Sequence, residues 1–114
     1  MADGVIYLDF ADGVNRVMKN VKLYVRLLTK FRNDTKLDKL EAALAAGDFG
    51  TAQAEAHTVK GIAANLSLTE LFKQSLELET QIKAKSVNPA QVETVKSVYA
   101  ITVQEVDRVI AENG

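Results

Sequence analysis

The chain has 114 residues, of which 47% are apolar and 25% are charged, and it contains one proline and six glycines. These values predict one domain over residues 1–114 with a single modest core and mainly helical structure. The formal charge of −1 gives no basic excess for nucleic-acid binding. Because cysteine is absent and there is one histidine, we expect no disulfide, no metal site and no bound cofactor.

Membrane and export signals are not evident in the sequence. No apolar run reaches the length of a membrane span, and the start Met1-Ala2-Asp3-Gly4 lacks the basic and apolar regions of a signal peptide. We therefore expect a cytoplasmic protein without membrane contact, and a monomer.

The first half of the chain predicts two helices. Apolar residues spaced three and four apart indicate a helix over residues 14–31, and the short apolar stretch 6–10 before it predicts a helical turn or lid. A second helix is expected over residues 35–46, with Thr35 as its N-cap and Gly47 as its stop.

The second half predicts three more helices. Asp48 is expected to cap a helix that runs to Leu66, with small residues on its inward side. The run Ser67-Leu68-Thr69-Glu70 resembles a capping box and predicts the start of the next helix. Asn88 followed by Pro89 predicts the start of the last helix. Short connections make neighbours antiparallel, so the predicted fold is all-α: an up-down four-helix bundle with an additional short N-terminal or extra helix.

His57 is the single histidine, and it shares one helix surface with Lys60 at i+3 and Gly61 at i+4. At 100° per residue, His57 lies about 130° from the inward direction of its helix, Gly61 about 170° and Lys60 about 70°. His57 and Gly61 are therefore predicted to face solvent. Glycine inside a helix costs about 1 kcal/mol relative to alanine, so we interpret Gly61 as giving a partner backbone close access to the imidazole.

Three further residues are candidates for this site. In an antiparallel hairpin turning near Ser67-Leu68, Glu79 lies at the height of His57, where its carboxylate could accept a hydrogen bond and fix the imidazole tautomer. Gln53 and Ala64 lie on the His57 side of the helix and are candidate partner contacts together with Lys60 and Gly61.

The run Ala56-His57-Thr58-Val59-Lys60-Gly61-Ile62-Ala63-Ala64-Asn65-Leu66 resembles the signature of histidine phosphotransfer (HPt) domains of multistep phosphorelays. Leu8-Asp9-Phe10, Tyr24 and Leu78-Glu79 extend the resemblance over nearly the whole chain. The sequence departs from the family at Ser67, where many members have glycine. We interpret that serine as the cap of the following helix.

The resemblance implies a phosphocarrier rather than an enzyme. His57 would accept a phosphoryl group from an aspartyl phosphate of a response-regulator receiver domain and pass it to another receiver. Lys60 would help to neutralise the phosphate, and Gly61 would leave room for the receiver. Mg²⁺ is expected on the receiver, and a hybrid sensor kinase is a further possible partner. No nucleotide-binding loop is visible, so we expect neither ATP binding nor autokinase activity.

Two alternatives stay open. The chain could be a helical adaptor that binds partners without chemistry, with the histidine incidental. It could also be the phosphotransfer module of a larger hybrid sensor or chemotaxis-type kinase.

Overall fold

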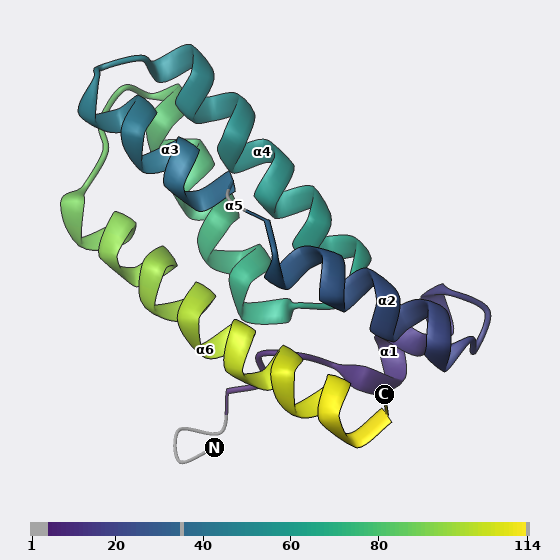
Figure 1. The fold of residues 1–114 in the computed structure, drawn as a ribbon. Helices are drawn as coiled ribbons and strands as arrows, with labels where there is room; N and C mark the ends of the chain where they lie inside the picture. Colours follow the sequence, from purple (N-terminus) through teal and green to yellow (C-terminus); the bar gives the residue numbers. More distant parts are fainter. Residues whose placement is uncertain (1–4, 35, 114) are drawn as a thin grey trace.

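The regular structure of the protein is helical throughout the part that the computed structural model describes, residues 5–34 and 36–113 (Figure 1). The helices are α1 (Phe10–Arg16), α2 (Val21–Arg32), α3 (Lys36–Ala45), α4 (Phe49–Asn65), α5 (Thr69–Lys83) and α6 (Pro89–Asn113). Over the same residues, no helix combines the length and the apolarity needed to cross a bilayer.

The helices form the predicted antiparallel bundle. In Figure 1, α2 and α3 follow one another along one side, and α4, α5 and α6 run beside them in alternating directions. Helix α4 packs between α3 and α5, while α6 packs between α5 and α2. The short helix α1 lies at the end of the bundle against α2. The predicted bundle with an additional short N-terminal helix is therefore confirmed.

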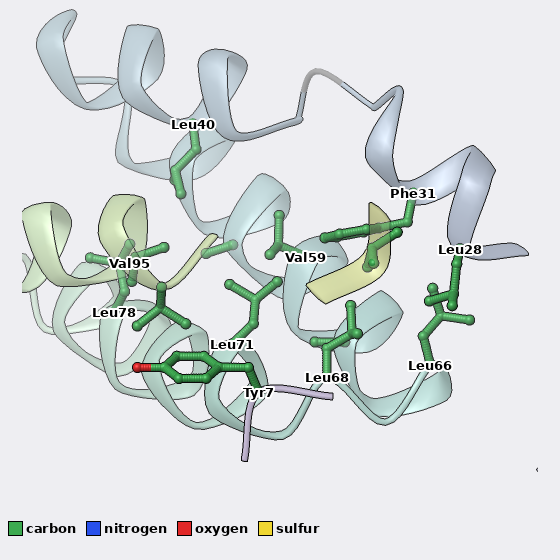
Figure 2. Packing of buried hydrophobic residues seen from close by; sticks show 14 of the residues in the cluster. Tyr7, Leu28, Phe31, Leu40, Val59, Leu66, Leu68, Leu71, Leu78 and Val95 are labelled. Carbon is green, nitrogen blue, oxygen red and sulfur yellow. The ribbon is translucent and has the colours of Figure 1, made fainter. Parts of the chain in front are cut away.

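The core is one continuous cluster of buried side chains, to which each of the helices α2 to α6 contributes. Figure 2 shows Val59 of α4, Leu71 and Leu78 of α5, and Val95 of α6 pointing into it. Tyr7, from the segment before α1, is also buried among these side chains. Burial of such side chains contributes about 1.5–3 kcal/mol each, which outweighs the low helix propensity of the valines in α6.

Three helix boundaries lie where their signals predicted them. Gly47 has a φ of +73°, and the amide groups of Gly47 and Asp48 bond back to the carbonyl groups of Leu44 and Ala43, which closes α3 in a Schellman motif. Asp48 then caps α4 by accepting a hydrogen bond from the Thr51 amide at 3.1 Å. Helix α6 begins at Pro89, as predicted. Thr35, predicted to cap the helix before Gly47, lies outside the described residues.

The predicted continuous helix over residues 14–31 is wrong. The stretch 6–10 was predicted to be a helical turn or a lid; it forms no helical turn before Phe10, but it packs on the bundle through the buried Tyr7, as a lid would. Residues 5–9 are irregular, and α1 begins at Phe10. The chain then breaks after Arg16, because Met18 and Lys19 have positive φ angles, and Asn20 caps α2 by accepting a hydrogen bond from the Leu23 amide at 3.0 Å. Apolar spacing alone could not reveal the break, since it continues in phase across it.

The predicted capping box at Ser67 is also wrong. Leu68 occupies the N-cap position of α5, with no side-chain hydrogen bond, while Ser67 has a φ of +58°. The amide of Leu68 bonds to the Ala63 carbonyl at 2.9 Å, so Ser67 occupies the left-handed position that ends α4. This conformation favours glycine, which gives a physical reason for the glycine that the resemblance implies at this position.

The N-terminal segment is fastened to the turn between α4 and α5. The Tyr24 hydroxyl donates to the Leu66 carbonyl at 2.6 Å, the Ser67 hydroxyl donates to Asp12 Oδ2 at 2.5 Å, and the Asp9 amide donates to the Ser67 carbonyl at 2.9 Å. The strained conformation of Ser67 is thus held by bonds from residues far away in sequence.

We predict that Gly13→Ala destabilises the protein by about 1–3 kcal/mol. A Cβ at Gly13 would lie 2.3 Å from Cζ of the buried Tyr24, so either α1 or the tyrosine ring must move. Urea unfolding followed by circular dichroism measures the change. Gly50→Ala is the matched control, because the nearest heavy atom to its new Cβ is 3.7 Å away. Equal stability of the two variants would contradict the prediction.

Candidate functional site

His57 stands on the outer side of α4, with 69% of its side chain exposed. Its helix turns Ala52, Ala56, Val59 and Ala63 into the core, so a residue one position after Ala56 must point away from it. The predicted exposure of the imidazole is therefore confirmed. One ring edge nevertheless contacts the neighbouring helix, because Nδ1 lies 3.1 Å from Glu79 Oε2.

Glu79 is a charged side chain in a buried position, with 3% of it exposed. It follows the inward stripe of α5 by one residue, next to Leu78. The hairpin register predicted from the turn is thus confirmed, since His57 and Glu79 lie opposite one another. Burial acts to raise the pKa of Glu79. The hydrogen bond and the charge of Lys60, followed by His57 and Lys83, outweigh it and lower the pKa below its ordinary value of 4.5.

Two lysines accompany this carboxylate. Lys60 Nζ lies 2.7 Å from Glu79 Oε1, and only 21% of the Lys60 side chain is exposed. Lys83 Nζ lies 3.7 Å from Glu79 Oε2, and 56% of its side chain is exposed. One buried negative charge therefore has two cations beside it. The cluster carries a surplus positive charge at the surface, next to the imidazole.

The contact between His57 and Glu79 determines which ring nitrogen is available. An ionised carboxylate has only acceptor oxygens, so in the neutral imidazole Nδ1 must carry the proton that it donates to Glu79. The lone pair is then on Nε2, at the opposite side of the ring from Glu79. A positive charge developing on the ring during attack by Nε2 would be stabilised by the buried carboxylate.

Gly61 leaves open space beside the imidazole. A Cβ built at this position would meet no heavy atom within 4 Å, and the residue is exposed, as predicted. The helix therefore gains nothing in packing from having glycine here and loses about 1 kcal/mol of helix propensity. Gln53 and Ala64, the other candidate contacts on this surface, are both half-buried.

An apolar strip extends from the cluster along α5. Leu76 and Phe72 precede Glu79 by three and seven residues, so the three share one side of the helix. Leu76 is 43% exposed, which is unusual for a large apolar side chain in this protein. Beyond the strip lies a hollow of about 240 Å³ between α4, α5 and α1. Its walls include Ala64, Phe72, Asp12 and Arg16.

The structure brings together the residues proposed from sequence and adds others. His57, Lys60 and Glu79 form one contact cluster, whereas Gly61, Gln53 and Ala64 line the surface around it. Lys83 was missed as a site residue. Its position four residues after Glu79 was the available signal, since such pairs are neighbours on a helix. Arg16, which borders the hollow, was not proposed as a site residue, because only the chain break before α2 brings α1 to this place.

We predict that Glu79→Gln lowers the free energy of unfolding by about 1–3 kcal/mol at neutral pH, because Lys60, Lys83 and His57 lose their charged, buried acceptor. The pKa of Glu79 is lower in the folded state than in the unfolded state. Its contribution to stability is therefore complete at pH values above the unfolded-state pKa, and it is lost as the pH falls through the folded-state pKa. The difference between wild type and variant should therefore be constant above about pH 5 and shrink below pH 4.5.

Urea unfolding at several pH values measures this difference. Glu77→Gln is the matched control, because Glu77 is exposed on the same helix. A difference between wild type and Glu79→Gln that stays constant down to pH 3, which is about 1.5 units below the ordinary pKa of 4.5, would contradict the prediction.

The comparisons with known proteins agree with this geometry. A family model described as "Hpt domain" matches residues 26–111, which is most of the chain. Neither the curated proteins nor the solved structures gave a match. The match covers α4 and α5 and thus the whole cluster around His57. The chain belongs to the Hpt domain family, whose members act in histidine phosphotransfer in phosphorelays and interact with receiver domains.

Proposed function

We propose that His57 is the phosphoacceptor of this Hpt domain, and that it receives a phosphoryl group from one receiver domain and passes it to another. The observation that carries the proposal is the contact of 3.1 Å between His57 Nδ1 and the buried Glu79, on an otherwise exposed imidazole. That contact leaves Nε2 unprotonated and accessible to a partner. The family membership supplies the reaction class.

The proposed transfer balances with one bond formed and one broken. The Nε2 lone pair attacks the phosphorus of the receiver's aspartyl phosphate, a P–N bond forms, and the P–O bond to the aspartate breaks. The receiver carboxylate leaves with the electron pair. Nδ1 keeps its proton, and Glu79 stabilises the positive charge on the ring. In the second step, the aspartate of another receiver attacks the phosphorus and the P–N bond breaks.

Lys60 and Lys83 supply charge for this step. Each has Glu79 as its ion-pair partner in the unphosphorylated protein. A phosphoryl group on Nε2 adds negative charge beside a cluster with one surplus cation. Lys83, which is more exposed and lies 1.0 Å farther from Glu79 than Lys60 does, is the more easily released of the two (3.7 Å against 2.7 Å). Phosphoryl transfer depends mainly on such positioning and electrostatic stabilisation.

The remaining assignments follow from this role. Mg²⁺ would be held by the receiver domain, and this chain would act as a carrier without ATP binding or autokinase activity of its own. Gln53, Gly61 and Ala64 would contact the receiver. The cytoplasm is the compartment in which we expect the reaction.

Phosphotransfer from radiolabelled receivers tests the phosphoacceptor. Receiver domains of the source organism, charged with labelled acetyl phosphate and Mg²⁺, should give the wild type an acid-labile, base-stable label. His57→Gln should take up none. Label on this variant would overturn the assignment. A wild type that binds receivers and takes no label from any of them would favour the adaptor instead.

Gly61→Gln should fold normally and accept the phosphoryl group from receivers about tenfold more slowly or worse, since a displacement near 1 Å is costly in such reactions. Phosphoramidate, a small donor, should label His57 at the wild-type rate. Gly61→Ala is the matched control, which should be up to about 1 kcal/mol more stable than wild type. Unchanged transfer from receivers to Gly61→Gln would remove the access argument.

A further inference from the structure

Helix α1 borders the surface on which a receiver must dock. The hollow lined by Ala64, Phe72, Asp12 and Arg16 lies seven residues along α4 from His57, at nearly the same angle about the helix axis. Seven residues of α-helix span about 10 Å. A standard interface buries about 800 Å² per partner, which is a patch of roughly 16 Å radius. A receiver centred on His57 therefore covers the hollow as well.

The surface between His57 and the hollow is suitable for protein contact. Leu76 and Phe72 form an apolar strip that leads from Glu79 to the hollow, and Phe72 is one of its walls. Exposed apolar side chains next to a recess are typical of the buried centre of an interface. The receiver-facing surface is thus continuous from the imidazole to α1.

Arg16 presents a donor edge at the rim of this hollow. Its Nε donates to Asp12 Oδ2 at 2.9 Å, and within the described residues its terminal nitrogens make no hydrogen bond. Asp12 is held in turn by the Ser67 hydroxyl at 2.5 Å. The hydrogen bond from Ser67, and then that from Arg16, lowers the pKa of Asp12, so the pair stays charged. A guanidinium oriented in this way suits a carboxylate, which it can bind through two nitrogens.

The family model begins at residue 26, so α1 lies outside the part of the chain that it matches. The cluster around His57 lies inside it. The cluster around His57 therefore belongs to the matched part, whereas Arg16 and Asp12 precede it and lie at the edge of the same surface.

Resting on the proposed function, we propose that α1 selects among receiver domains. The hollow between α4, α5 and α1 takes an apolar side chain of the receiver, and Arg16 pairs with a carboxylate of the receiver beside it. Arg16 contributes to recognition of the partner and not to the transfer of the phosphoryl group.

Transfer kinetics with Arg16→Glu test this proposal. Among receivers that phosphorylate the wild type, the variant should raise KM about tenfold or more, because an attractive charge pair becomes repulsive, and kcat should change little. Raising the salt concentration should raise KM for the wild type more than for Arg16→Gln. Arg16→Gln also serves as the milder variant if charge reversal beside Asp12 impairs folding.

Lys30→Glu is the matched control. Lys30 lines the larger recess of about 570 Å³ on the α2 side of α4 and not the hollow beside Phe72, while Arg16 borders both. An equal rise in KM for Arg16→Glu and Lys30→Glu would overturn the proposal. So would an unchanged KM in both Arg16→Glu and Arg16→Gln. Phosphoramidate should label His57 at the same rate in the wild type, both Arg16 variants and Lys30→Glu. A wild type that takes no phosphoryl group on His57 from either donor would overturn the proposed function itself.

Discussion

The buried carboxylate of Glu79 is the group on which the rest of the site depends. A charge with 3% exposure is costly to bury unless it is paired and hydrogen-bonded. Lys60, Lys83 and the imidazole of His57 supply those partners, two from α4 and one from α5 itself. The same contacts fix the imidazole tautomer and hold two cations beside the carboxylate that contacts the ring. Stability and chemistry therefore rest on the same set of bonds.

That arrangement requires α4 and α5 to lie close together. The inward side of α4 consists largely of alanine, with Ala52, Ala56 and Ala63 completely buried, and α5 contributes the small Ser75. Short side chains allow the helix backbones to approach, so a glutamate on one helix can reach both a histidine and a lysine on the other. Larger residues at these positions would separate the partners of Glu79 even if the fold survived.

The sequence was most informative where periodicity and register act together. The inward stripe of α4 placed His57 and Gly61 outside, and the turn near Ser67 placed Glu79 opposite His57; the structure has both features. The sequence was misleading where a local motif competed with long-range contacts. Ser67 resembles a helix cap, yet bonds to Asp9 and Asp12 hold it in the left-handed conformation. Likewise, apolar spacing continues through the break at Met18 and Lys19, so the separation of α1 from α2 could not be predicted.

These long-range bonds also explain why α1 can take part in recognition. A helix of seven residues has little stability alone. Here it is anchored by Gly13 against the Tyr24 ring, whose hydroxyl bonds to Leu66, and by Asp12 against Ser67. Leu66 and Ser67 directly follow the helix that carries His57, so α1 and the imidazole belong to one rigid frame. A receiver that contacts Arg16 would therefore meet a side chain whose backbone is already positioned, and less conformational entropy would be lost on binding.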